Sequence, residues 1–321
     1  MSRLADRVAL AGYRTGWSLV RRMPDRVAYG VFDVIADVAW RRRGKGVERL
    51  RGNYATVRPE LEPAELDGLV RAGMRSYLRY WCDSFRLPDY SVEDLIHGVR
   101  VVGINPVRAH LQSGRSVVVF LGHLGNWDVA GAWSTTQLAP LTTVVERLKP
   151  EELFDEFLAF REGLGMRIIP LTGGSSDVFR ELTKACRAGA LVPLLADRDL
   201  TNGGVEVDFC GQRARMAVGP AALAINTGAA LHPATIHYER QPQGHGWRTV
   251  VIFHDEIPLP GRGTSREKIQ AMTQACADVL AQAVREHTQD WHMMQRVFTK
   301  DLVERGVSGS GQVSGQAGGR A

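Results

Sequence analysis

The pattern of hydrophobic and polar positions changes near residue 99. From there to residue 287, short apolar runs alternate with stretches in which apolar residues recur at helical spacing. Repeated alternation of this kind predicts an α/β fold, with a mostly parallel or mixed central sheet and helices on both faces. The strands are expected at 99–104, 116–121, 142–146, 166–171, 190–196, 204–210, 230–238 and 247–254. The helices are expected at 106–111, 126–135, 151–164, 173–187, 220–227 and 264–287, the last with a Thr264/Glu267 capping box.

Before residue 99 the apolar positions have helical spacing only. Helices are expected at 4–22, 25–40 and 64–85, the first with arginines opposite its apolar stripe. The apolar run 27–40 is 14 residues long and includes Asp33 and Asp37. A membrane span needs about 20 mostly apolar residues, so no transmembrane helix is predicted here, and the absence of a small-residue cleavage site argues against a signal peptide.

These patterns predict three regions. Residues 1–98 are expected to form a helical, membrane-surface region packed on the core, and residues 99–305 an α/β core. The Gly/Ser-rich segment 306–321 is expected to be disordered.

The positive charge is concentrated at the N-terminal end. Residues 1–51 contain 12 Lys and Arg against 5 Asp and Glu, whereas the other residues contain 28 and 30. Because apolar residues and Trp accompany these charges, we expect an anionic membrane surface as the partner. A solvated helix packed on the core is the simpler alternative. Nucleic acid is a weaker one, since no recognised binding motif is present.

Four widely separated cysteines, Cys82, Cys186, Cys210 and Cys276, show no CxxC or Cys/His ligand spacing. The sequence therefore predicts neither a disulfide framework nor a metal site, and a reducing, cytosolic setting fits best.

The strand 116–121 has no polar alternation, which is typical of a central strand covered on both faces. His123 follows its end, in the region of an open α/β sheet where ligands bind. Gly122 and Gly125 allow a tight turn, and Asn126 can cap the next helix. A turn would also let Asp128 fold back onto the imidazole, so that His123 acts as a general base. Alternatively, His123 is an ordinary loop residue and Asp128 only a favourable charge at a helix N-terminus.

A second polar group follows the strand 190–196. Asp197 and Asp199 should reach the same sheet edge as His123, with Arg147, Lys149 and Arg161 as nearby cations. A base, carboxylates and cations at one edge would form a polar site. The alternative is that residues 197–199 form a solvated turn.

Several segments together resemble a known family. The motif Gly122-His-Leu-Gly-Asn-Trp-Asp128 is similar to the first motif of the bacterial lysophospholipid and lipid A lauroyl acyltransferases, and most similar to their phosphatidylinositol mannoside acyltransferase branch. Supporting segments span nearly the whole chain except the tail: 144–150, 160–166, 196–200, 207–211 and 290–296.

The resemblance implies that palmitoyl-CoA donates its acyl chain to the 6-position of a mannose of phosphatidylinositol mannosides, at the cytoplasmic face of the inner membrane. His123 would be the general base and Asp128 would orient it, with Asp197 as a further catalytic acidic residue. Besides His123, the positions matching acyl-CoA contacts are Arg161, Gly203 and Asn226. A long apolar groove is expected, and no metal or cofactor. Alternatives are a lauroyl or myristoyl transferase to lipid A, an acyl-CoA hydrolase and a catalytically silent lipid-binding protein.

Overall fold

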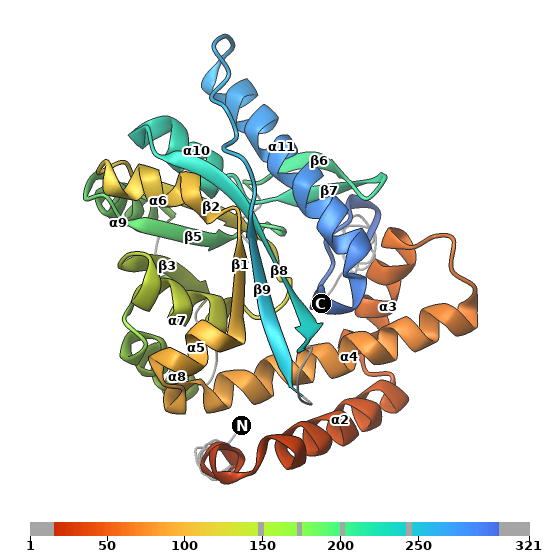
Figure 1. Cartoon of the computed structure of the whole chain (residues 1–321). Coiled ribbons are helices and arrows are strands. Elements are labelled where there is room, and N and C mark those ends of the chain that lie inside the picture. The colour runs from red at the N-terminus through yellow and green to blue at the C-terminus, as the bar shows by residue number, and fades with distance from the viewer. Residues whose placement is uncertain (1–15, 147–150, 172–174, 200–202, 242–245, 302–321) are drawn as a thin grey trace, which may run out of the picture.

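The computed structural model describes residues 16–146, 151–171, 175–199, 203–241 and 246–301. Its centre is a seven-stranded sheet surrounded by helices (Figure 1). The strands are β1 (Val99–Val102), β2 (Val117–Leu121), β3 (Leu141–Glu146), β4 (Met166–Leu171), β5 (Leu191–Leu195), β8 (Ala230–Arg240) and β9 (Trp247–Phe253). The helices from α5 onward are α5 (Val92–Gly98), α6 (Ile104–Gln112), α7 (Trp127–Gln137), α8 (Glu151–Gly163), α9 (Ser175–Arg187), α10 (Gly219–Thr227) and α11 (Ser265–Glu286).

The strand order is β1-β9-β8-β2-β5-β3-β4. Every pair in the sheet is parallel except β8 with β9, which are joined in sequence and run antiparallel. The prediction of a mostly parallel or mixed α/β sheet is therefore confirmed. β2 lies between β5 and β8, so its apolar residues are buried along its whole length.

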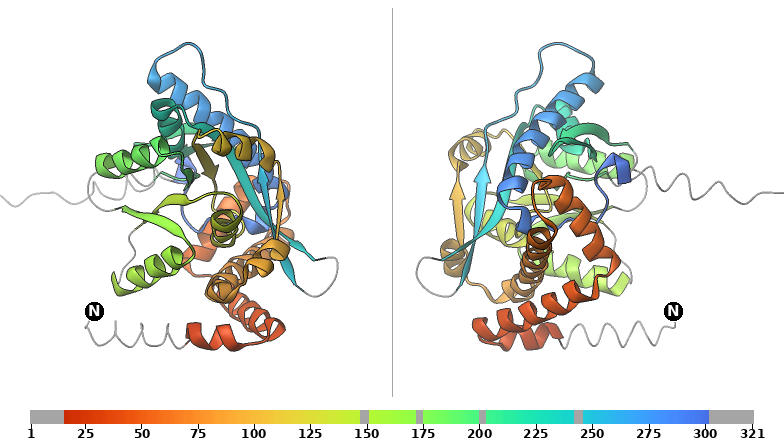
Figure 2. Two further views of the ribbon diagram at one scale, coloured as in Figure 1. Left: turned by 60° about the vertical axis from the view of Figure 1, so that its left-hand side comes forward. Right: turned by 90° about the vertical axis from the view of Figure 1, so that its right-hand side faces the viewer.

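The two faces of β2 belong to separate hydrophobic cores. Val118 and Phe120 pack in one core with residues of α9, α10 and α11, and Val117, Val119 and Leu121 pack in the other with residues of α6, α7 and α8. The views in Figure 2 show helices on both sides of the sheet. This two-sided cover explains why the strand has no polar alternation.

Ahead of α5 lie the helices α2 (Asp25–Arg42), α3 (Lys45–Val57) and α4 (Pro63–Arg86). α2 packs along α4 (Figure 1) through buried Ala28, Phe32 and Ala36. Of the predicted helix 4–22, residues 16–22 are helical and residues 1–15 lie outside the described part of the chain. Within the described ranges, none of the helices has the length and apolar character required to cross a membrane.

The predicted division at residue 98 stays a prediction, and the predicted tail 306–321 lies outside the described residues. The capping box of Thr264 and Glu267 is confirmed at the start of α11. The predicted strand 204–210 is present as β6 (Val205–Phe209), but it continues into β7 (Gln212–Met216), which was not predicted, and the two form a separate antiparallel ribbon. Cys210 and Gly211 connect them with φ of 52° and 81°. Because Cys is not a residue typical of such turns, the hairpin was not visible in the sequence.

Candidate active site

Two glycines allow the turn after β2 to pack closely against its neighbours. A Cβ atom on Gly122 would lie 2.8 Å from a methyl group of Leu280 in α11, and one on Gly125 would lie 2.5 Å from the carbonyl oxygen of Ile236. Gly125 also has φ of +64°, a conformation that glycine adopts readily. Asn126 then caps α7 by accepting a hydrogen bond from the Val129 amide at 3.0 Å, as predicted. This tight turn holds His123 at the carboxyl end of β2.

His123 lies against Asp197, which follows the end of β5. Leu121 pairs with Leu195 in the parallel ladder, so the same register carried two residues further brings His123 opposite Asp197. His123 Nδ1 is 2.6 Å from Asp197 Oδ1, and the His123 backbone amide donates to Oδ2 at 2.8 Å. The predicted arrival of Asp197 at the same sheet edge is thus confirmed.

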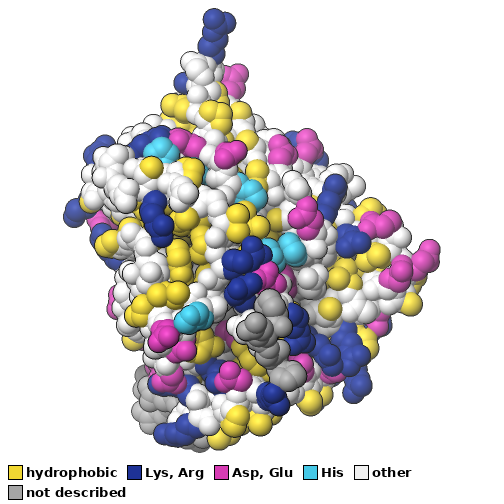
Figure 3. Space-filling model, viewed as in Figure 1, with side chains coloured by type: hydrophobic (Ala, Val, Ile, Leu, Met, Phe, Trp, Pro, Cys, Tyr) yellow, Lys and Arg dark blue, Asp and Glu magenta, His cyan; other side chains and the backbone are white. Residues whose placement is uncertain are grey.

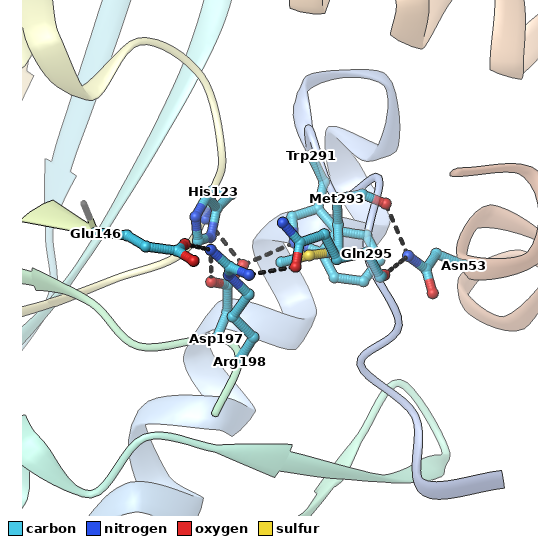
Figure 4. A network of polar contacts seen from close by, with 8 residues as sticks. All are labelled: Asn53, His123, Glu146, Asp197, Arg198, Trp291, Met293 and Gln295. Atoms are coloured by element: carbon cyan, nitrogen blue, oxygen red, sulfur yellow. Dashed lines mark hydrogen bonds and ion pairs between the residues drawn. The ribbon is translucent and has the colours of Figure 1, made fainter. Parts of the chain in front are cut away.

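Asp197 is completely buried, which would by itself raise its pKa. The adjacent imidazole and the hydrogen bonds to the carboxylate outweigh burial, so the pKa of Asp197 lies below its usual value. One of those bonds comes from Trp291 Nε1, which donates to Oδ2 at 3.0 Å (Figure 4). An ionised carboxylate on Nδ1 favours the His123 tautomer whose Nε2 carries the free lone pair. The pair therefore has the arrangement of a general base and the acid that orients it.

Asp128 does not occupy the position expected for it. Its carboxylate accepts two hydrogen bonds from Arg161, at 2.7 and 3.1 Å, and a third from the Tyr80 hydroxyl at 2.7 Å. The structure thus corrects the expected geometry: the carboxylate on the imidazole is Asp197. Burial works against the charge of Arg161, but Asp128 outweighs it and the pKa of Arg161 lies above its usual value. A catalytic role for Asp128 stays a prediction.

A largely apolar cavity of about 400 Å³ adjoins this site, between the sheet and helices α4 and α7. His123, Asp128 and Arg161 all line it. Its apolar wall comes mainly from side chains of the strands and from α4 and α7: Tyr77, Trp81, Val119, Leu121, Ala130, Leu141, Val145, Met166, Leu191, Leu195, Ala234, Ile236, Val251 and Phe253. A cavity of this size and character is typical of a site for a ligand with an extended apolar part.

The segment 290–296, called the C-terminal segment below, supplies parts of the site that could not be recognised from the sequence. The His292 amide donates to the His123 carbonyl oxygen at 2.7 Å, next to the Trp291 bond. Asn53 of α3 holds this segment by donating to the carbonyl oxygens of Met293 and Gln295, at 2.7 and 2.8 Å (Figure 4). The segment 290–296 was noted only as part of a resemblance, because its contacts are with residues far away in the sequence.

Arg198, next to Asp197, turns toward β3 and the C-terminal segment. It forms an ion pair with Glu146 at 2.8 Å and a hydrogen bond with Gln295 (Figure 4). Asp199 accepts a hydrogen bond from the Gly204 amide at 2.8 Å. Arg147 and Lys149 lie outside the described residues.

Two predicted acyl-CoA contacts are not among the residues that line the cavity: Gly203 and Asn226. Gly203 is exposed in the segment before β6. Asn226 lies in the last turn of α10 and donates to the Ala222 carbonyl oxygen. α10 leads into the start of β8, which pairs with the start of β2, so Asn226 lies at the opposite end of the sheet from His123. Their roles in donor binding stay predictions.

Comparison with known proteins identifies the family of this chain. Residues 8–300 match the family described as bacterial lipid A biosynthesis acyltransferase. The chain is 42% identical over 300 residues to the phosphatidylinositol mannoside acyltransferase of Mycolicibacterium smegmatis, covering 93% of this chain and 94% of that one. It is 41% identical over 294 residues to the protein of the same name from Mycobacterium tuberculosis, covering 91% and 89%. The chain belongs to the bacterial lipid A biosynthesis acyltransferase family.

Proposed function

We propose that this protein transfers a fatty acyl chain, palmitoyl in the first instance, from acyl-CoA to the 6-position of a mannose of phosphatidylinositol mannosides, with His123 as the general base. The observation that carries the proposal is the buried pair of His123 and Asp197 beside an apolar cavity. The names of the two relatives above support the choice of glycolipid acceptor.

In this reaction His123 Nε2 removes the proton of the mannose hydroxyl as its oxygen attacks the thioester carbonyl. The tetrahedral intermediate then collapses, the carbon–sulfur bond breaks, and the proton passes from His123 to the leaving CoA thiolate. Asp197 stabilises the imidazolium that forms between the two transfers. Base catalysis of this type contributes about 10²–10⁴-fold to the rate. The chemistry needs no metal or cofactor, and acyl-CoA is a substrate.

The cavity is suited to the acyl chain of the donor. Its apolar wall between the sheet and α7 would cover the chain, and His123 at its edge would meet the thioester. Asp128 and Arg161 also line the cavity, but in the free protein they neutralise each other. This ion pair leaves the buried part of the cavity wall without net charge, which suits an uncharged acyl chain.

The acceptor is a membrane lipid, and we propose that α2 binds the cytoplasmic face of the inner membrane. Exposed apolar residues recur along one side of α2, and they are Val27, Val31, Val34, Ile35 and Val38, with Val34 64% exposed. Exposed Arg41, Arg42 and Lys45 lie at its C-terminal end. Figure 3 shows hydrophobic and basic atoms side by side along the lower edge, where Figure 1 places α2. Apolar side chains with adjacent cations favour an anionic lipid surface.

The helix α4 connects this surface with the active site. α2 packs on one side of α4, and α4 contributes Tyr77, Tyr80 and Trp81 to the cavity wall. A lipid acceptor reached through α2 would therefore lie near the site where its hydroxyl is needed.

The test is a matrix of donors and acceptors with purified protein. Palmitoyl-CoA with mannosylated phosphatidylinositol should release free CoA and give a monoacylated product, located on the mannose by mass spectrometry. His123→Ala should lower the rate at least about 10²-fold. His97→Ala, at an exposed position in α5, serves as the matched control.

Each alternative has its own outcome in the same matrix. Faster turnover with acyl carrier protein and lipid A precursors would indicate a lauroyl or myristoyl transferase. CoA release at the same rate with and without glycolipid would indicate a hydrolase. Vesicle binding without any turnover would indicate a lipid-binding protein, and full activity in His123→Ala would exclude His123 as the base.

A further inference from the structure

We propose that His110, His232 and Glu256 form a binding site for a divalent transition metal ion such as Zn²⁺, separate from the acyltransferase site. One ligand atom from each of these residues lies within 4.8 Å of the others. His110 lies near the end of α6, His232 in β8, and Glu256 in the segment after β9. Two imidazoles and one carboxylate are a ligand set that zinc takes in proteins, with a fourth position open for water.

His232 is prepared to act as a ligand. Its side chain is only 1% exposed, and its Nδ1 lies 2.8 Å from the His254 carbonyl oxygen. A carbonyl can only accept, so Nδ1 carries the proton and Nε2 presents its lone pair. Nε2 is buried and has no hydrogen-bond partner within the described part of the chain. A ligating histidine typically has its second nitrogen bonded to a carbonyl in this way, whereas an unpartnered buried nitrogen is costly in an ordinary core.

The side chains of His110 and Glu256 face each other and can move. His110 Nε2 lies 3.1 Å from Glu256 Oε2, close to the separation of about 3.4 Å that two ligands have in a tetrahedral zinc site. The ligand atoms lie within 4.8 Å of one another, and metal binding would draw them closer together. The side chains of His110 and Glu256 are 24% and 31% exposed, so they have the freedom to move toward the fixed His232. The metal would replace the present bond between His110 and Glu256.

Arg115 influences this site through Glu256 and also lies 3.4 Å from His110 Nδ1. Its guanidinium donates to both carboxylate oxygens, at 3.1 and 2.6 Å. Burial opposes ionisation of Glu256, but Arg115 outweighs it and the pKa of Glu256 lies below its usual value. A carboxylate has about four lone-pair positions, so Arg115 leaves room for a metal. The positive charge of Arg115 limits the affinity of the site for a metal ion, whereas its hydrogen bonds hold the Glu256 carboxylate in place.

The site lies away from the proposed reaction centre. His232 is level with Val119 in the sheet, four residues before His123, and none of the three ligands lines the apolar cavity. The Ile257 amide bonds to the Leu231 carbonyl oxygen at 2.8 Å, which holds the segment of Glu256 beside the start of β8. A bound metal would thus join α6, β8 and the segment leading to α11, and its effect would be on stability.

The experiment uses the full-length chain without a histidine tag, freed of metal by a chelator and then equilibrated with ZnCl₂. Elemental analysis should find one zinc per chain, and thermal unfolding should shift to higher temperature. Co²⁺ in the same site should give the visible absorption of tetrahedral coordination. All four cysteines are buried, so they do not compete for the metal in the folded protein.

His110→Ala should abolish both the bound zinc and the thermal shift, because it removes one of three ligands, at a position where the side chain is 24% exposed. His97→Ala should keep both, and acyl transfer should continue in each variant. Glu256→Gln is a second test that retains the shape of the side chain. Absence of bound zinc in the wild type would overturn the proposal, as would zinc bound equally by His110→Ala, which would show an adventitious ion only.

Discussion

The Asp197 carboxylate contacts His123 through both of its oxygens, Oδ1 at the imidazole Nδ1 and Oδ2 at the backbone amide. This double contact fixes the position of the residue as well as the direction of its ring. Trp291 Nε1 shares Oδ2, so three donors converge on one fully buried side chain. Such a carboxylate is strongly held, and its charge is available to stabilise an imidazolium.

Asp197→Asn should therefore lower kcat by about 10³-fold or more, because an amide cannot stabilise the imidazolium and permits the wrong tautomer. KM for acyl-CoA should change little. Initial rates would measure both quantities. Asp199→Asn, two residues further along the same segment, is the matched control and should stay within a few-fold of the wild type. Equal losses in the two variants would point to disruption of the segment rather than to loss of the carboxylate.

Asp128→Asn should lower the free energy of unfolding by about 3 kcal/mol or more, because it leaves the Arg161 guanidinium buried without its counter-charge. Urea denaturation would measure the change. The double variant Asp128→Asn/Arg161→Met should recover part of the loss, since it contains no unpaired charge. If the single variant were as stable as the wild type, the pair would not stabilise the fold. A changed pH profile of kcat/KM would instead favour a direct role for Asp128 in catalysis.

Gly125→Ala should destabilise the protein by about 3 kcal/mol and reduce activity, because it combines an unfavourable positive φ with a clash against the Ile236 carbonyl. Gly114→Ala separates the two effects. Gly114 also has positive φ, at 79°, but a Cβ there would have open space. Gly114→Ala should therefore lower the free energy of unfolding by only about 1 kcal/mol. Thermal unfolding would measure the stability of both variants. Similar losses of stability would show that the close approach to the Ile236 carbonyl oxygen is not the cause.

The double variant Val34→Asp/Ile35→Asp should weaken binding to anionic vesicles at least about tenfold, because each replaced side chain contributes about 1.5 kcal/mol or more when buried in an apolar phase. Sedimentation with vesicles would measure it. Leu259→Asp, at a position 55% exposed outside α2, should bind as the wild type does. Unchanged binding of the double variant would exclude α2 as the lipid-binding surface.

Stability should fall with mild acid, and His292 should contribute to this. Burial is the largest cause that lowers the pKa of His292 to about 3, whereas an unfolded histidine titrates near about 6.5. Between these values the unfolded state binds the additional proton, so the free energy of unfolding decreases as pH falls. His292→Gln should reduce that slope by up to about 1.4 kcal/mol per pH unit between about pH 6 and 5. Urea denaturation at several pH values would measure it, and His97→Gln should keep the wild-type slope.

The arrival of His123 and Asp197 at one edge of the sheet could be predicted because it follows from the strand pattern, whereas their direct pairing was not predicted. Two apolar strands ended in polar residues, and the ends of neighbouring parallel strands meet at one edge. The environment of Asp128 could not be predicted in this way. Only its local neighbours were visible, whereas Arg161 and Tyr80 lie 33 and 48 residues away on other helices. The sequence therefore predicts that Asp128 contacts the His123 imidazole, whereas the structure pairs it with the Arg161 guanidinium.

The same limit applies to Trp291 and to the proposed metal ligands. Spacing rules detect ligands that share a turn or a helix, but His110, His232 and Glu256 come from separate elements that only the folded sheet brings together. β7 was missed for another reason. Its alternation of exposed and buried positions involves only Ala214 and Met216 on the buried side, too few to distinguish it from a loop.

The dependence of Asp197 on Trp291 also determines when the site can exist during synthesis. Trp291 and the segment that Asn53 holds are translated after both β2 and β5. A nascent chain can form β2 and β5 earlier, but its carboxylate lacks the indole donor until residue 291 has left the ribosome. The hydrogen-bond set of Asp197 is thus completed only after residue 291 has been translated, and a truncation before Trp291 would leave His123 beside a carboxylate that lacks one of its three donors.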